Sequence, residues 1–205
     1  LLDQGAVVDS INVHGSTALL QAVVENRRRT TKLLLEHGAN PNSENKRKVT
    51  PLIAAAYNGN SLIVELLLDV GAQLGGIDAT GKGALVYSAA KGFSRVVEAL
   101  LDAGESVNSR FSNSLTALMW ASGHTNEVPS SDGVRTVSLL LARGANLIAR
   151  DDRGRTALMI AAQRSHKHIV ELLLDHGADR TVVDNAGNTA WDLTSDPQLM
   201  PLLSP

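Results

Sequence analysis

The chain alternates short apolar runs with polar, glycine-rich segments. Residues 52–56 (LIAAA) follow Thr50, a capping residue type, and Pro51, which suits the first turn of a helix, so this segment predicts a short helix. Residues 62–68 (LIVELLL) predict a second helix, whose apolar face is broad enough to pack against two neighbouring helices. Gly71 suits the end of that helix. Turn-forming residues such as 40–43 (NPNS) follow and predict a projecting hairpin.

The same pattern repeats along the whole chain. The residue that begins the first helix recurs every 33 residues, with one interval of 40, at Thr17, Thr50, Gly83, Thr116, Thr156 and Thr189. The glycine that ends the second helix keeps the same intervals, at Gly5, Gly38, Gly71, Gly104, Gly144 and Gly177. Since the two series agree, we interpret the chain as a repeat array with one insertion of seven residues.

These residues resemble the ankyrin repeat family. The family signature, Thr-Pro-Leu-His-x-Ala followed by Leu-Leu-Leu-x-x-Gly-Ala, is similar to TPLIAAA at 50–56, TALMIAA at 156–162 and LLLEHGANPN at 33–42. The usual histidine is replaced in every unit, by Leu20, Ile53, Val86, Met119, Met159 and Asp192, which removes a side-chain hydrogen bond between units. The resemblance covers the entire chain and implies an all-α ankyrin-repeat solenoid of about six repeats with short β-hairpin loops.

We expect a single ankyrin-repeat domain over residues 1–205. Its full repeats are predicted at 12–44, 45–77, 78–110, 111–150 with the seven-residue insertion, and 151–183. Residues 1–11 have the pattern of the tail of a partial repeat, so the chain is expected to be cut from a longer one. Residues 184–205 are predicted to form a C-terminal capping repeat, whose second helix is shortened by Pro197 and Pro201.

Composition and charge narrow the possible functions. Hydrophobic residues make up 43% of the chain, enough to bury a continuous core, and no apolar run reaches the length of a membrane-spanning helix. The net charge of −2 gives no positive field for nucleic acid. The chain has no cysteine, so disulfides, thiolate metal sites and a cysteine nucleophile are excluded.

No catalytic, cofactor or metal site is predicted, and the chain is not expected to be an enzyme. His166 and His168 form the only close histidine pair, but their spacing places the rings on different sides of a helix and no further ligand completes a site. His37 and His176 occupy the same repeat position, which indicates a structural role. Gly81-Lys82-Gly83 lacks the glycine spacing and the Ser or Thr of a phosphate-binding loop.

The resemblance implies that a protein partner binds the concave face, formed by the first helices and the hairpins. Three of the six aromatic residues, Tyr57, Tyr87 and Trp120, fall on the same face of three successive first helices, and such residues often anchor interfaces. Basic and polar positions complete the predicted partner-binding set: Arg47, Lys82, Lys91, His124, Arg155 and Arg164. Two alternatives stay open, namely that the aromatic rings fill gaps between helices and that the cations are ordinary solvated positions.

The insertion, within residues 124–133, either adds partner contacts or is a tolerated surface loop. We therefore interpret the chain as a monomeric protein-protein interaction module, cytoplasmic by the habit of the family. Its basic positions are consistent with an acidic protein partner. One alternative is a structural spacer or self-assembling array. Another is the targeting portion of a larger enzyme, effector or channel.

Overall fold

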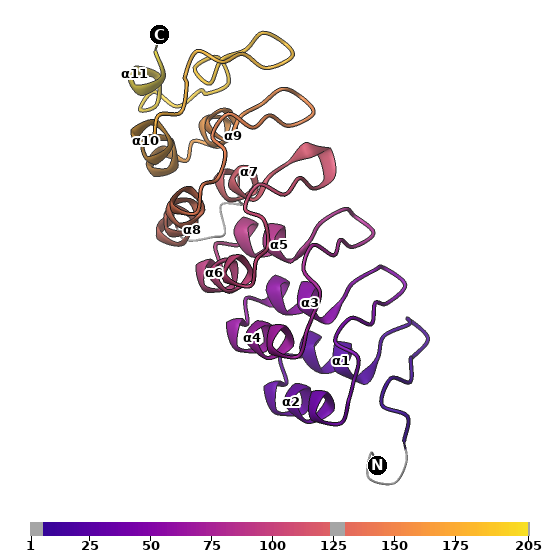
Figure 1. Ribbon diagram of the computed structural model, residues 1–205. Coiled ribbons are helices and arrows are strands. Elements are labelled where there is room, and N and C mark those ends of the chain that lie inside the picture. The colour runs from indigo at the N-terminus through magenta and orange to yellow at the C-terminus, as the bar shows by residue number, and fades with distance from the viewer. Residues whose placement is uncertain (1–5, 124–129, 205) are drawn as a thin grey trace. The chain divides into compact units, whose positions relative to one another are not determined.

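The computed structural model describes residues 6–123 and 130–204, and it consists of paired helices joined by hairpins (Figure 1). The first helices of the pairs are α1 (Ala18–Val24), α3 (Pro51–Asn58), α5 (Ala84–Ala90), α7 (Ala117–Ser122) and α9 (Ala157–Gln163). The second helices are α2 (Arg28–Glu36), α4 (Ser61–Asp69), α6 (Ser94–Asp102), α8 (Ser130–Ala142) and α10 (Lys167–Asp175). A short helix, α11 (Met200–Leu203), ends the described chain. The predicted helical repeat fold is confirmed.

The first helices begin where their capping threonines predict. The Oγ1 atoms of the four threonines that precede α1, α3, α7 and α9 each accept a hydrogen bond from the backbone N–H three residues later, at 3.2 to 3.4 Å: Thr17, Thr50, Thr116 and Thr156. Each such cap contributes about 1 kcal/mol, because it satisfies an N–H that has no partner inside the helix. The third repeat has Gly83 at this position, and glycine has no side chain that could accept this bond.

The second helices end at glycine because the chain there takes a left-handed conformation. Gly38, Gly71, Gly104, Gly144 and Gly177 have φ between 78° and 99°. A Cβ atom at any of these positions would meet no other atom within 4 Å. The requirement for glycine is therefore set by the backbone conformation and not by space.

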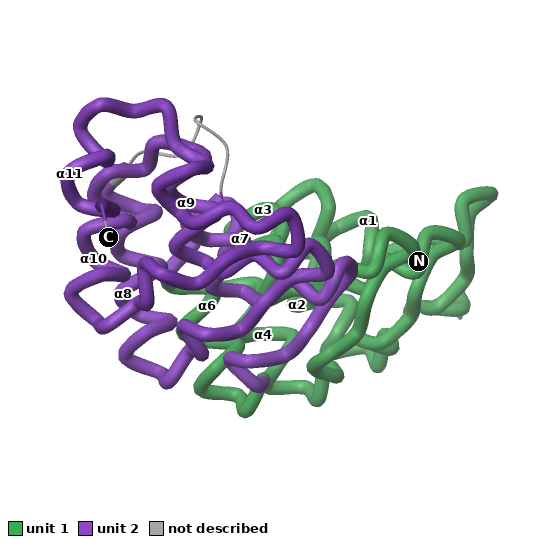
Figure 2. The backbone as a smooth tube through the Cα atoms, turned by 90° about the horizontal axis from the view of Figure 1, so that it is seen from above, with its two compact units in different colours: residues 1–88, 95–105 green, residues 89–94, 106–205 purple. Residues whose placement is uncertain are grey.

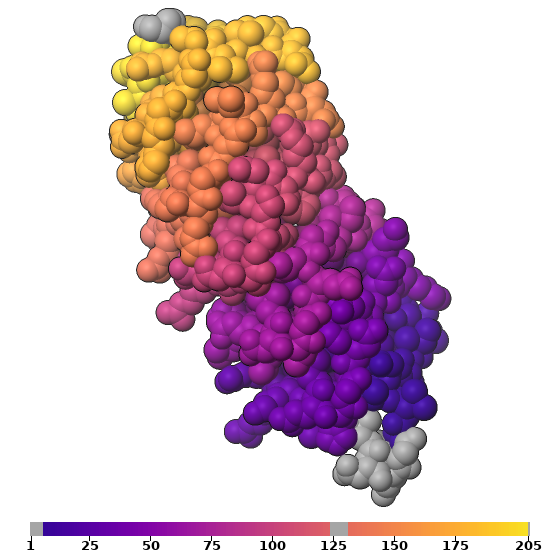
Figure 3. Space-filling view, in the orientation of Figure 1, coloured from indigo at the N-terminus to yellow at the C-terminus, as the bar shows by residue number. Residues whose placement is uncertain are grey.

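The chain divides into two compact units, which Figure 2 colours separately: unit 1, residues 1–88 and 95–105, and unit 2, residues 89–94 and 106–205. In unit 1, α1 contacts α2 and α3, while α4 contacts α2 and α3. In unit 2, α7 contacts α8 and α9, while α10 contacts α8 and α9. Within each unit, repeats that follow one another in the sequence lie in adjacent bands of the surface (Figure 3).

Apolar side chains between the helices form the core of each unit. In unit 1 the fully buried positions include Leu19, Leu20, Ile63 and Leu67, and in unit 2 they include Leu118, Met119, Leu140, Leu158 and Leu173. These leucines and methionines recur at equivalent positions of successive repeats, so each repeat covers the apolar face of the next. This burial is the main stabilising contribution, because one helix pair cannot bury both of its faces alone.

The hairpins are held by a recurring side-chain turn. In five hairpins the Oδ1 atom of an Asn or Asp accepts hydrogen bonds from the backbone N–H groups two and four residues later: Asn12, Asn45, Asp78, Asp151 and Asp184. Regular strand pairing in the described residues is limited to single antiparallel bridges, Ile11 to Thr17 and Ile77 to Gly83. Two backbone hydrogen bonds also close each of these five hairpins, so backbone and side chain hold the loops together.

The fourth hairpin departs from this pattern because Phe111 occupies the Asn or Asp position. A phenylalanine cannot accept the two backbone hydrogen bonds. The chain instead forms a short 3₁₀ turn at Ser112–Ser114, in which Asn113 and Ser114 have φ of 59° and 57°. Left-handed conformations at residues other than glycine are uncommon and cost about 1 kcal/mol or more each.

The end of the chain differs from the other repeats. Residues 190–193 form turns and not a helix, although Thr189 sits where a first helix is expected to begin. The Oδ2 atom of Asp192 accepts from both the backbone N–H and the hydroxyl of Thr189. The Asp192 N–H donates to Oγ1 of Thr189 and the Leu193 N–H donates to the Thr189 carbonyl, each at 3.3 Å, so the cap and one helical hydrogen bond form but the helix does not continue. The second helix is reduced to the four residues of α11, which has Pro201 in its first turn and follows Pro197.

Candidate functional site

A groove lies in unit 1 between the first helices and the hairpins, and its volume is about 630 Å³. We call it the unit 1 groove. Apolar side chains form most of its wall, and Arg47 and Asp78 are its ionisable residues besides the tyrosines. Its lining residues are Val24, Arg47, Val49, Ile53, Ala54, Tyr57, Asn58, Asp78, Ala79, Thr80 and Tyr87.

Two tyrosines from neighbouring repeats meet in this groove. The ring centroids of Tyr57 on α3 and Tyr87 on α5 are 5.3 Å apart, and the ring planes are inclined at 78°, which is the edge-to-face arrangement that aromatic pairs favour. Tyr57 remains 48% exposed and Val24 of α1 remains 50% exposed. The groove therefore presents apolar surface to solvent from a fixed aromatic pair.

A buried carboxylate fixes the Tyr87 ring. The Tyr87 hydroxyl donates a 2.6 Å hydrogen bond to Oδ2 of Asp78, while Oδ1 accepts from the backbone and hydroxyl of Thr80 and from the backbone N–H of Lys82. Burial raises the pKa of Asp78, but the hydrogen bonds from Tyr87, Thr80 and Lys82 outweigh it, so the pKa lies below its usual value. Burial and the bond to Asp78 raise the pKa of Tyr87. Asp78 is therefore ionised at neutral pH, and both its oxygens are already engaged within unit 1.

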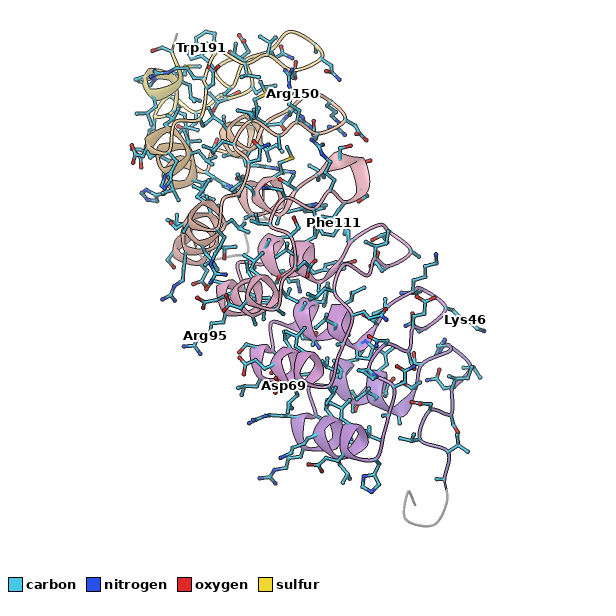
Figure 4. All side chains as sticks on the ribbon, viewed as in Figure 1. Lys46, Asp69, Arg95, Phe111, Arg150 and Trp191 are labelled. Carbon is cyan, nitrogen blue, oxygen red and sulfur yellow. The ribbon has the colours of Figure 1, made fainter. Side chains whose placement is uncertain are left out.

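The hairpin that contributes Arg47 to the groove is basic. Lys46, Arg47 and Lys48 are exposed in the hairpin before α3, and Figure 4 shows Lys46 on the opposite side of unit 1 from Asp69 of α4 and Arg95 of α6. The Lys82 ammonium lies 5.8 Å from the centroid of the Tyr87 ring, a cation-π distance.

A smaller pocket of about 290 Å³ lies in unit 2, and we call it the unit 2 pocket. It is more polar than the groove of unit 1 and is lined by Asn113, Leu115, Met119, Trp120, Gly123, Asp151, Asp152, Arg153, Arg155, Ile160, Gln163 and Arg164.

Arg155 is held inside the unit 2 pocket by its neighbours. Its Nε atom lies 3.6 Å from Oδ2 of Asp151, its Nη1 atom donates to Oε1 of Gln163 at 2.7 Å, and its side chain is only 13% exposed. Trp120 is half-buried, and packing under it is tight, since a Cβ atom on Gly123 would lie 2.5 Å from Cγ2 of Ile160.

The predicted partner-binding residues fall into four groups. Arg47, Tyr57 and Tyr87 line the unit 1 groove, and Lys82 lies beside the Tyr87 ring. Trp120, Arg155 and Arg164 line the unit 2 pocket. Lys91 lies elsewhere, with its ammonium 5.9 Å from the centroid of the Phe93 ring. His124 is outside the described residues.

Much of the predicted insertion is also outside the described residues, at 124–129. Its last residues, 130–133, form the first turn of α8, which has thirteen residues where the other second helices have nine. Part of the inserted sequence therefore lengthens a helix.

Sequence reasoning missed two kinds of residue in the unit 1 groove. Val24 shares the predicted face of Tyr57 but was not selected because it is an ordinary apolar residue, and only the structure shows that Ile53 also lines the groove. Asp78 could have been found, since Asn or Asp recurs at 12, 45, 78, 151 and 184 at the intervals of the repeat.

The histidines have structural partners. The Nδ1 atoms of His37 and His176 each lie within 2.9 Å of the carbonyl oxygen four residues earlier, Leu33 and Leu172, at the end of a second helix. His166 contacts the Ser122 carbonyl at 2.8 Å and His168 contacts Glu171 at 3.3 Å. In the described part of the chain, no three His, Asp or Glu side chains gather as metal ligands would. None of its helices combines the length and apolar character needed to cross a bilayer.

Comparison with known proteins identifies the family. The chain matches the family model for ankyrin repeats in three overlapping stretches, residues 29–111, 52–130 and 127–193. The chain belongs to the ankyrin repeat family, whose repeats are protein-protein interaction modules.

Among solved structures, the fold is similar to the ankyrin repeat domain of Bcl-3, described as a unique member of the IkappaB protein family. The TM-score is 0.83 with 23% sequence identity, over 99% of this chain and 88% of that one. This likeness establishes the fold.

The curated relatives are similar over part of the chain. Ankyrin repeat domain-containing protein 63 of Mus musculus is 40% identical over 83 residues, which is 40% of this chain and 20% of that protein. A putative ankyrin repeat-containing protein of Treponema pallidum is 40% identical over 75 residues, 35% of this chain and 25% of that protein. The matched part of the chain thus spans about a quarter or less of these relatives.

Proposed function

We propose that the chain binds a protein partner through the concave face, the surface formed by its first helices and hairpins. The observation that carries this proposal is the unit 1 groove, where Tyr57 and Val24 expose about half of their side chains beside the fixed Tyr87 ring. Burying such apolar surface against a partner is favourable, and a rigid aromatic residue loses little conformational entropy on binding.

Tyr57 is a better residue to test than Tyr87 or Trp120. Tyr87 is tied to Asp78 and Trp120 is half-buried, so truncating either side chain would also disturb the fold. Tyr57 on α3 is 48% exposed. Leu62 on α4 provides a matched control, because it is 47% exposed and does not line the groove.

The experiment compares affinity capture from a lysate of the source organism by the wild-type chain, Tyr57→Ala and Leu62→Ala, with mass spectrometry of the retained proteins. We expect at least one protein to be retained by the wild type and by Leu62→Ala and to be lost with Tyr57→Ala. Removing a central aromatic anchor costs about 2 kcal/mol or more of binding free energy. Identical retained sets for all three chains, at unchanged circular dichroism, would refute the groove as the binding site.

A further inference from the structure

The unit 1 groove has a chemical character that restricts its partner, and this inference rests on the proposed function. Its floor is apolar, with Val49, Ile53 and Ala54 beside the tyrosines. Asp78 is 6% exposed, and its two oxygens already accept hydrogen bonds from Tyr87, Thr80 and Lys82. The groove wall therefore offers no accessible carboxylate to pair with a cationic ligand.

Arg47 of the groove wall and its exposed chain neighbours Lys46 and Lys48 form a basic segment, which we call the rim. In the described part of the chain, no ion pair joins Lys46, Arg47 or Lys48 to a carboxylate. The segment 44–48 contains these three cations and one acidic residue, Glu44, so its net charge is positive. By contrast, Arg155 of unit 2 is neutralised by Asp151 at 3.6 Å.

The rim is also held in position by its neighbours. The backbone N–H of Lys46 donates to the His14 carbonyl at 3.2 Å, and the backbone N–H of Ala79 donates to the Arg47 carbonyl at 2.9 Å. Hydrogen bonds to the preceding and the following hairpin thus fix the backbone that carries the cations. A fixed set of charges costs less ordering on binding than a mobile loop would.

We propose that the unit 1 groove binds a protein segment in which an aliphatic or aromatic side chain is flanked by carboxylates. The apolar side chain packs between Val24 and the tyrosine pair, and the carboxylates face Arg47 and its neighbouring lysines. The volume of about 630 Å³ lies within the range of about 300 to 1,000 Å³ that is usual for ligand sites. A basic segment is repelled by the rim, and a wholly polar segment leaves the exposed apolar wall uncovered.

Nucleic acid is the other polyanion that a basic rim could attract. The groove does not favour it, because Tyr57 and Tyr87 meet edge to face at 78° and do not form a parallel platform for successive bases, and because the chain has a net charge of −2. An oligonucleotide is therefore a test of the proposal and not part of it.

The test begins with a library of random twelve-residue peptides displayed on phage, selected on the full 205-residue chain after depletion on Tyr57→Ala. We expect the enriched peptides to combine at least one aliphatic or aromatic residue with an excess of Asp and Glu. Peptides that depend on Tyr57 but are basic, or that lack an apolar residue, would overturn this inference and leave the proposed function standing. If no Tyr57-dependent peptide is enriched, this inference fails, and the lysate capture with Tyr57→Ala decides the proposed function separately.

The second step measures the Kd of one enriched peptide by fluorescence anisotropy. We expect Arg47→Glu to weaken binding about fivefold to tenfold at low salt, with a smaller effect at 1 M salt, because attraction at the rim becomes repulsion. Arg29→Glu on α2 is the matched control, since it makes the same change in net charge away from the groove, and we expect less than a twofold effect. Equal effects of the two variants, or tighter binding of a twelve-nucleotide single-stranded DNA than of the peptide, would overturn the inference.

Discussion

Glu105 occupies a position that holds alanine in the other described repeats. It follows Gly104, where Ala39, Ala72, Ala145 and Ala178 follow the corresponding glycines. Its side chain is only 7% exposed, and neither carboxylate oxygen has a hydrogen-bond partner within the described residues. We therefore expect Glu105→Ala to stabilise the protein at neutral pH, because it removes a buried charge that nothing compensates.

The magnitude follows from the pKa of this carboxyl group. Burial raises the pKa of Glu105 from its ordinary value of 4.5 to about 7. The difference of about 2.5 corresponds to about 3 kcal/mol, since each pKa unit represents about 1.4 kcal/mol. The pKa of Glu105 is higher in the folded state than in the unfolded state. The free energy of unfolding is therefore highest below pH 4.5, where the group is protonated in both states, and it falls by this amount as the pH rises through about 7.

The assay is urea unfolding of the wild type, Glu105→Ala and Glu105→Gln, followed by circular dichroism at several pH values from 4.5 to 8. The difference in unfolding free energy between wild type and variant removes the contribution of every other titrating group, because that contribution is the same in both. We expect the stabilising effect of Glu105→Ala to grow by about 3 kcal/mol across this range. Glu105→Gln keeps the shape without the charge and should lose the same pH dependence. A difference between wild type and Glu105→Ala that stays constant with pH would refute the argument.

Three further substitutions test the fold of unit 1, each by thermal and urea unfolding. Thr50→Ala should lower stability by about 1 kcal/mol by removing the cap of α3, whereas Thr50→Ser should be nearly neutral. Gly38→Ala should cost about 1 kcal/mol although its surroundings are open, because φ is 78°; an unchanged midpoint would contradict this. Tyr87→Phe should lower the free energy of unfolding by about 1 to 2 kcal/mol, because Oδ2 of Asp78 loses its hydroxyl donor. An unchanged stability would show that this hydrogen bond contributes little.

Local signals in the sequence predicted the start and end of most helices correctly. A threonine cap needs only the backbone three residues ahead, and a terminating glycine needs only its own φ, so both can be recognised without tertiary contacts. The same reasoning did not predict that the segment after Thr189 stops at a turn, although the Thr189 cap and the hydrogen bond from the Leu193 N–H to the Thr189 carbonyl are both present.

The candidate site was only partly accessible from the sequence. The helix face that selected Tyr57 and Tyr87 also selected Lys91, yet the two tyrosines meet at 5.3 Å in the groove while Lys91 lies beside Phe93. A position on a helix face gives the direction of a side chain from one helix, whereas a groove also depends on how the adjacent repeat and the hairpins pack. The hairpin's part is seen at Asp78, whose bond to Tyr87 joins a hairpin to a helix residue nine positions later.

The repeat, its helix pairs and the turn residues between them follow from local sequence patterns, because these features depend on interactions within a few residues. Which exposed positions form the groove, and the burial of Glu105 where other repeats carry alanine, became apparent in the folded chain. Both depend on the packing of residues from different repeats, and the energy of a buried charge depends on its whole surroundings and not on its neighbours in the chain.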